Sequence, residues 1–262
     1  MLIDSHCHLN YTGLRDDQAG VIARARAAGV GGMLGIATRE SEWDEVIGLA
    51  DAHADIWATV GIHPHEADAH ANIDAARLIA VAAHPKVIGI GETGLDYHYD
   101  KSDRARQRTS FRAHIAAART TGCPLIVHTR DAEDDTAAIL TNEMGQGRFT
   151  GVIHCFTASA AFAEAALALG FYISLSGIVT FKNAKDLQAV AVELPADRLL
   201  VETDAPFLAP VPFRGKVCEP AYVAETAKFI AQLRGVDEAT LAAQTTANFF
   251  ALFTRARQPA AA

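Results

Sequence analysis

The chain opens with MLIDSHCHL (residues 1–9), and this stretch decides which fold the rest of the sequence is expected to adopt. Its apolar start, followed by Asp4, predicts a short buried strand. His6 and His8 lie two positions apart at the carboxyl end of that strand, so both imidazoles are expected to face the same side. Two convergent neutral imidazoles supply half of a typical metal site. The ends of the other strands are therefore expected to supply the remaining ligands.

Apolar runs like the first one recur along the chain, and Ala-rich segments with helical spacing separate them. The runs are continuous, as in VIGI (87–90), which is typical of parallel strands buried on both faces. The expected strands are 2–6, 32–37, 56–63, 87–92, 125–128, 151–154, 171–176 and 199–202. The expected helices include 40–52, 73–83, 102–121, 160–169, 221–233 and 237–253. This alternation predicts an α/β fold, a (β/α)8 TIM barrel, with a doubly wound open sheet as the alternative.

Size and composition fit one such barrel. The chain has 262 residues, of which 50% are hydrophobic, and no linker divides it, so a single domain is expected over 1–257 with a frayed tail over 258–262. The net charge of −8 argues against a broad basic surface that tracks nucleic acid. A nucleic acid remains a candidate substrate, because bound metal ions can hold phosphate.

Cellular location and partners are predicted from what the sequence lacks. It shows no secretory signal and no apolar stretch that reads as a membrane span, and its four cysteines form no C-x-x-C pair. We therefore expect a cytoplasmic protein with reduced thiols, no membrane association and no stable protein partner.

Histidine or a carboxylate closes most of the expected strands. In a barrel the carboxyl ends of all strands surround one mouth, so these side chains are expected to converge. The candidate metal ligands are His6, His8, Glu92, His128, His154 and Asp204.

Four imidazoles and two carboxylates exceed the needs of one tetrahedral zinc ion. They fit two divalent ions about 3.5–4 Å apart, the usual arrangement for hydrolysing phosphate esters, with a bridging carboxylate for which Glu92 is the better choice. Mixed nitrogen and oxygen ligands suit zinc, manganese or cobalt(II), and magnesium is less natural though not excluded. Burying the six groups unpaired would cost several kcal/mol, which favours the metal site over a purely structural role.

Cations near the mouth are candidates for binding substrate. His63 is expected to contact the substrate or its leaving group. Arg130 is expected to clamp phosphate or to form a salt bridge at the mouth. The loop 210–220 carries Arg214 and Lys216, which suit a phosphate-reading lid or a solvated pair of loop cations.

Other residues receive weaker assignments. Asp96 is expected either to orient a ligand histidine or to cap a helix. Tyr97 and Phe213 are the aromatic residues expected to stack bases near the mouth. Four histidines in helical or loop segments are expected at the surface: His53, His70, His84 and His114.

The strand-end motifs resemble those of the TatD-type metal-dependent deoxyribonucleases. The matching motifs are DSHCH (4–8), GIHPH (61–65), GETGLDY (91–97), HCF (154–156), ETDAP (202–206) and RGK (214–216), in the order of the family. The resemblance implies a TIM barrel, a two-metal site held by the six ligands above and hydrolysis of DNA phosphodiesters, in some members from the 3′ end. Cys218 and the pair Thr157-Ala158 depart from the common pattern in loops, which affects substrate choice more than metal binding.

The predicted activity is metal-dependent hydrolysis of DNA at strand ends or in single-stranded segments. An activated water attacks phosphorus, and Asp204 orients that water and accepts its proton. The alternative is an amidohydrolase-like enzyme that cleaves a carboxylic ester, lactone or amide, including an aminoacyl linkage on RNA. A third class, a non-catalytic protein with a structural metal, is disfavoured because structural zinc sites are closed and usually rich in cysteine.

Overall fold

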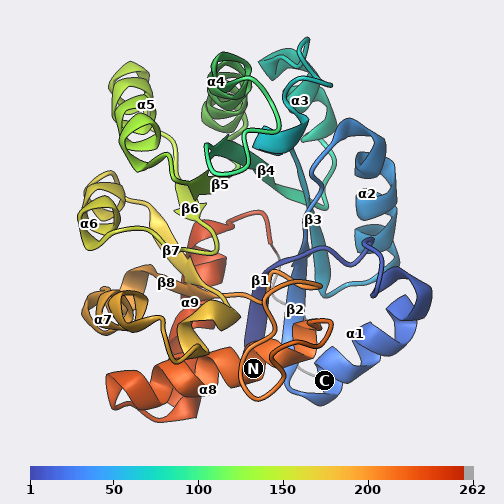
Figure 1. Cartoon of the computed structure of the whole chain (residues 1–262). Helices are drawn as coiled ribbons and strands as arrows, with labels where there is room; N and C mark the ends of the chain where they lie inside the picture. Colours follow the sequence, from blue (N-terminus) through green and yellow to red (C-terminus); the bar gives the residue numbers. More distant parts are fainter. Residues whose placement is uncertain (257–262) are drawn as a thin grey trace.

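Eight parallel strands pair in the order in which they occur in the chain, and helices surround them (Figure 1). The computed structural model describes residues 1–256. The strands are β1 (Leu2–Cys7), β2 (Val30–Gly35), β3 (Ile56–Val60), β4 (Val87–Asp96), β5 (Leu125–Arg130), β6 (Gly151–Ile153), β7 (Tyr172–Leu175) and β8 (Leu199–Val201). The first and last strands meet where the Asp204 N–H donates to the His6 carbonyl (2.9 Å) and the His8 N–H to the Ala205 carbonyl (2.8 Å). This closure confirms the predicted TIM barrel over the open sheet.

The helices follow the strands in the predicted rhythm. They are α1 (Gln18–Ala27), α2 (Trp43–Ala52), α3 (Ala75–Val81), α4 (Arg104–Thr121), α5 (Glu133–Gln146), α6 (Ala160–Ala168), α7 (Lys185–Glu193), α8 (Val223–Arg234) and α9 (Glu238–Leu252). Short 3-10 turns are η1 (Arg15–Asp17), η2 (Glu40–Glu42), η3 (Pro64–Glu66), η4 (Gly177–Thr180), η5 (Ala196–Arg198) and η6 (Pro220–Tyr222). Within residues 1–256, no helix combines the length and apolarity needed to cross a membrane. The tail predicted over 258–262 lies outside the described residues.

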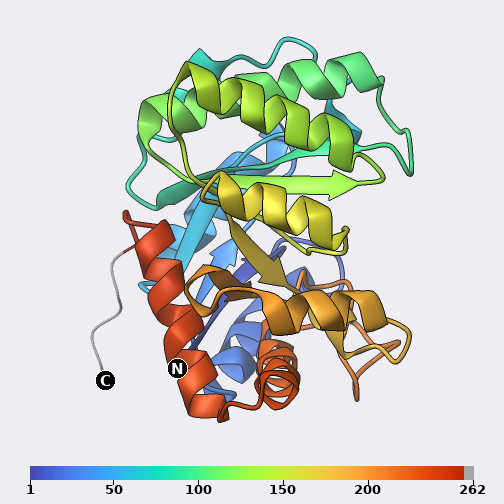
Figure 2. The same ribbon diagram turned by 90° about the vertical axis from the view of Figure 1, so that its left-hand side faces the viewer.

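Two apolar cores hold the barrel together. Buried residues on one side of each strand pack against the surrounding helices. On the other side, residues such as Ile3, Ile88 and Ile126 form a second cluster with Phe249 of α9 and Phe253 directly after it. Figure 2 shows the strands pointing to the right and α9 on the left, at the end where the strands begin. The helix thus covers the amino-terminal end of the barrel, and the carboxyl end forms the mouth.

An extra residue in β1 sets the direction of the first two predicted ligands. Between Asp4 and Cys7, three steps along β1 pair with only two steps along β2. Such a bulge shifts the alternation of side chains by one position. Ile3 therefore packs in the inner cluster, while beyond the bulge His6 and His8 point into the mouth and Cys7 packs with the outer core.

His114 differs from the prediction that it lies at the surface. It is fully buried in α4, where its Nε2 accepts from the Ile62 N–H (2.9 Å) and its Nδ1 donates to the Ser110 carbonyl (2.7 Å). Burial lowers the pKa of His114 to about 4 because the charged form is poorly solvated there. The other three histidines, His53, His70 and His84, are partly exposed as expected.

The buried His114 predicts a specific acid sensitivity. Below its ordinary pKa of 6.5 the unfolded chain binds a proton at this ring that the folded chain refuses down to about pH 4. The free energy of unfolding should therefore decrease as the pH is lowered through this range. This residue alone should account for a decrease of about 2 kcal/mol at pH 4.5. Urea unfolding at pH 7 and pH 4.5 should show a flatter pH dependence for His114→Gln than for the wild type. His84→Gln, which alters a partly exposed ring, serves as the control, and equal slopes for the wild type and His114→Gln would contradict the prediction.

Candidate metal centre

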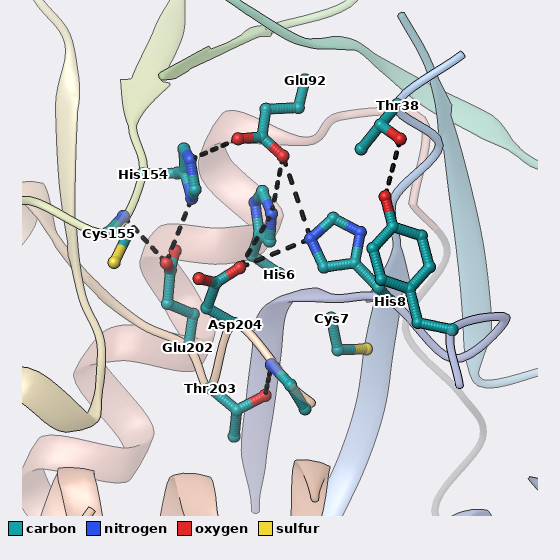
Figure 3. A network of polar contacts seen from close by, with 12 residues as sticks. His6, Cys7, His8, Thr38, Glu92, His154, Cys155, Glu202, Thr203 and Asp204 are labelled. Atoms are coloured by element: carbon teal, nitrogen blue, oxygen red, sulfur yellow. Dashed lines mark hydrogen bonds and ion pairs between the residues drawn. The ribbon is translucent and has the colours of Figure 1, made fainter. Parts of the chain in front are cut away.

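The structure brings all six predicted ligands together at the mouth, with Glu92 at their centre. Figure 3 shows Glu92 with His6, His8, His154 and Asp204 around it. A first group gathers around one oxygen of this carboxylate. Glu92 Oε2 lies 3.3 Å from His6 Nε2 and 3.9 Å from His8 Nε2. Asp204 Oδ1 lies 3.6 Å and 3.4 Å from the same two nitrogens. Two imidazoles and two carboxylates thus face one small space.

A second group surrounds the other oxygen of Glu92. Its Oε1 lies 2.8 Å from His154 Nε2 and 3.0 Å from His128 Nδ1. His63 Nε2 is 3.3 Å away, so this histidine, predicted to bind substrate, joins the group. The two oxygens of one carboxylate therefore serve two separate sets of imidazoles, which is the arrangement that a bridging ligand requires.

The donor atoms in this cluster fit a divalent cation. Within the described chain, both ring nitrogens of His6 and Nδ1 of His8 are buried without a hydrogen-bond partner. Leaving such atoms unpaired costs about 1–3 kcal/mol each, and a cation that binds Nε2 of His6 would remove part of that cost. The mixture of imidazole and carboxylate is typical of zinc, manganese and cobalt(II) sites. Burial alone would raise the pKa of Glu92, but the neighbouring His154 and His63 hold this pKa well below its usual range, which favours the ionised carboxylate.

Carboxylates behind the histidines orient two of them. His128 Nε2 lies 3.2 Å from Asp96 Oδ2, and His154 Nδ1 lies 3.3 Å from Glu202 Oε1. Such contacts fix which ring nitrogen faces a metal and raise its basicity. Asp96 thus takes the first of its two predicted roles. The role of Glu202 was missed, although its spacing of two from Asp204 at a strand end was a signal that both point inward.

A second buried pair shapes the strand end that carries Asp204. Asp4 accepts from the Thr203 N–H (2.9 Å) and from the Thr203 hydroxyl (2.6 Å). Burial raises the pKa of Asp4 to about 8, against the effect of these hydrogen bonds. The next residue, Asp204, has a φ of 58°, a left-handed conformation that aspartate tolerates better than most residues. The pair thus links β1 to β8 directly behind the predicted ligands.

A bulge in β4 positions Glu92. Three steps from Ile90 to Thr93 pair with only two steps along β5. Gly91, inside this bulge, has a φ of 137°, and a Cβ there would lie 2.6 Å from the Ile126 carbonyl oxygen. Only glycine fits this backbone position, as the glycines around Glu92 suggested.

A cavity of about 850 Å³ opens above the cluster. Its walls differ from the prediction. Phe213 stacks on Tyr222 with ring centroids 4.1 Å apart, and Tyr97 packs under Arg104, so neither residue predicted to stack bases lines the cavity. The aromatic and cationic residues that line the cavity are Tyr11, Tyr99, Phe207, Arg39, Lys101 and Arg130.

The cations predicted to bind substrate lie in two different places. Arg130 lines the cavity and stacks on Tyr99, with its guanidinium carbon 4.7 Å from the ring centre. Arg214 stacks on Phe181 at 4.5 Å, and Lys216 lies 5.5 Å from the ring centre of Phe213, both outside the cavity wall as traced over residues 1–256. The sequence places these cations in loops near the mouth, but it does not show which of their side chains point into the cavity.

Comparisons with known proteins agree over nearly the whole chain. A family model described as TatD related DNase matches residues 3–254. An uncharacterized metal-dependent hydrolase of Escherichia coli K12, YcfH, is 45% identical over 256 residues, which cover 96% of this chain and 95% of that protein. A protein of Erwinia tasmaniensis named 3'-5' ssDNA/RNA exonuclease TatD is 36% identical, with 96% and 99% covered. The crystal structure of the TatD homologue YJJV from Escherichia coli K12 is similar with a TM-score of 0.90, 29% identity and coverage of 97% and 98%.

The contacts of Asp96 and Glu202 predict that these residues control metal affinity from behind the ligands. We expect Asp96→Asn and Glu202→Gln each to weaken binding of Mn²⁺ or Zn²⁺ by about 10- to 100-fold, measured by isothermal titration calorimetry. Circular dichroism should show an intact fold. Asp131→Asn is the matched control, because Asp131 also contacts a histidine (His98, 2.8 Å) but at the exposed rim. Unchanged affinity in both test variants would contradict the prediction.

Proposed function

This chain belongs to the TatD-related DNase family and is a metal-dependent hydrolase, and from that premise we propose that it hydrolyses phosphodiester bonds at the ends of single-stranded DNA. The observation that carries the proposal is the position of Glu92 between two sets of imidazoles. Two-metal sites with a shared carboxylate are suited to phosphate esters, since the attacking and leaving oxygens both need stabilisation.

Two divalent cations would be held by the six residues at the mouth. His6, His8 and Asp204 would bind one of them and His128 and His154 the other, with Glu92 shared. Once bound, the cations would make a water molecule more acidic and offset the charge that grows on the phosphoryl oxygens. Zinc, manganese and cobalt(II) suit this ligand set better than magnesium does.

Asp204 is the residue we assign to proton transfer. Its carboxylate lines the cavity, and one of its oxygens lies against His6 and His8. It can therefore hold an attacking water in position and accept its proton, as a general base must. The left-handed backbone at Asp204 and the Asp4–Thr203 pair behind it fix the direction of this side chain.

The cavity supports the proposal that the substrate is the end of a strand. The guanidinium of Arg130 and the imidazole of His63 line the cavity near the cluster, where they can bind a phosphate. Phe207 offers an exposed ring at the wall, which suits an unpaired base. A cavity of about 850 Å³ has room for a nucleotide or two but not for a continuous duplex. The name of the Erwinia relative, an exonuclease on single-stranded DNA and RNA, points the same way.

The proposal predicts chelator-sensitive trimming of end-labelled DNA. Single-stranded DNA incubated with Mn²⁺ should lose nucleotides stepwise, and EDTA should abolish the reaction because it removes the cations. Asp204→Asn should lower kcat by about 100-fold or more, as expected when a general base is lost. Asp100→Asn, an exposed carboxylate of the loop after β4, should retain wild-type activity.

The same preparations should be offered esters and lactones. Rapid hydrolysis of a carboxylic ester or lactone, with DNA left intact in every metal tested, would overturn the proposed substrate in favour of the amidohydrolase-like alternative. Wild-type DNA cleavage by Asp204→Asn with its metals bound would overturn the role of Asp204 alone.

A further inference from the structure

Charge is distributed unevenly around the mouth of the barrel. The loops after β1 to β5 carry many carboxylates, which are Asp16, Asp17, Glu40, Glu42, Glu66, Asp68, Asp74, Asp100, Asp103 and Asp131. The segments 176–184 and 205–218, which follow β7 and β8, contain Lys182, Arg214 and Lys216 and no acidic residue. We call these two segments together the β7–β8 rim. A chain with a net charge of −8 thus concentrates uncompensated positive charge on one arc of its mouth.

The cations of the β7–β8 rim are accessible to a ligand and are not neutralised by carboxylates within residues 1–256. All three are exposed, and none forms an ion pair with another part of residues 1–256. Glu219, the first acid beyond the rim, is bound instead by Arg24 of α1, whose guanidinium contacts both of its carboxylate oxygens (2.7 and 3.0 Å).

Cations elsewhere on the mouth are mostly neutralised. Arg39 lies 2.8 Å from Glu42, Arg104 lies 2.8 Å from Asp100, and Arg15 lies 3.3 Å from Glu45. The unneutralised positive charge outside the cavity therefore lies mainly on the β7–β8 rim.

The two segments of the rim form one packed surface. The Val211 N–H donates to the Thr180 hydroxyl (2.9 Å), and the Arg214 guanidinium stacks on Phe181. At Gly177 the two segments approach each other so closely that a Cβ on this glycine would lie 2.2 Å from the Leu208 carbonyl oxygen. The rim is thus held in shape before any ligand arrives.

Exposed apolar side chains lie in the same segment as two of these cations. Phe207, Val211 and Val217 have 49%, 48% and 51% of their surface exposed. Phe207 also lines the cavity, and its ring contacts those of His8 and Tyr11, with centroids 6.2 and 6.1 Å apart. The rim therefore reaches the metal-ligand cluster at Phe207.

We propose that the β7–β8 rim is the track on which the substrate strand lies beyond the nucleotide being cleaved. This inference rests on the proposed function and names the path that the polynucleotide takes. Phosphates would contact Lys182, Arg214 and Lys216, and unpaired bases would pack on Phe207 and the neighbouring valines. Exposed cations and exposed apolar side chains in the same rim match a single strand, whose bases are accessible, better than a duplex, whose bases are stacked inside.

Binding of a single strand tests the track directly. We would measure fluorescence anisotropy of a labelled oligothymidylate of about twelve nucleotides, a length within the range that single-strand sites cover. The triple variant Lys182→Gln/Arg214→Gln/Lys216→Gln should bind it at least about tenfold more weakly at low salt, and the slope of log K against log salt should fall by about 2. Its kcat/KM should drop more for the oligonucleotide than for thymidine 5′-p-nitrophenyl phosphate, which offers no further phosphates to the three cations outside the cavity.

The matched control removes three cations that follow β1 and β4 and lie outside the β7–β8 rim. Arg15→Gln/Arg104→Gln/Arg106→Gln changes the net charge equally but alters side chains that pair with carboxylates, so binding should stay near that of the wild type. Equal binding by the rim variant and the wild type, or equal weakening by both triple variants, would overturn the track. Binding of polyglutamate as tight as that of the oligonucleotide would overturn the nucleic acid as its occupant.

Failure of the track and failure of the proposed function give different results. A wild-type protein that binds the oligonucleotide through the rim cations but cleaves no phosphodiester would keep the track and overturn the hydrolysis. Cleavage of both substrates with no loss in the rim variant would keep the hydrolysis and overturn the track. A wild-type protein that neither binds nor cleaves nucleic acid would overturn both.

Discussion

One carboxylate buried among imidazoles is the interaction on which the site depends. Glu92 is only 3% exposed, and a buried charge of this kind is costly unless its surroundings compensate it. His154, His128 and His6 lie within 3.3 Å of its two oxygens, from strands on different sides of the barrel. Neither the carboxylate nor the rings would be stable there alone, so the barrel, the bulge at Gly91 and the ligand cluster form one unit.

The sequence predicted the fold and the cluster because both follow from rules that tolerate local error. Continuous apolar runs identify parallel strands, and a barrel brings every carboxyl end to the same mouth, so His128 and Asp204 converge even if a boundary is misplaced. What the sequence could not supply depends on contacts between distant segments. The bulge before His6, the pairing of Asp4 with Thr203 and the burial of His114 all require the partner to be known.

The contacts of aromatic residues in loops could not be predicted from the sequence either. Phe213 and Phe207 lie six positions apart in one loop, yet the first packs on Tyr222 and the second lines the cavity. The composition likewise gives the net charge of the protein but not how that charge is distributed over its surface. A net charge of −8 argued against a basic surface, but charge acts locally over about one Debye length, roughly 8–10 Å, so an acidic protein can carry a cationic arc.

The last helix, α9, makes the two ends of the barrel different, because it covers only the amino-terminal end. Because Phe249 of α9 and Phe253 directly after it pack with the inner residues of the strands, the barrel below the mouth cavity is a closed apolar core and not a channel. A ligand that enters must leave by the way it came, so release of one product and admission of the next substrate compete for the same opening. A polymer therefore cannot pass through the barrel from one end to the other, which is compatible with the proposed cleavage at strand ends.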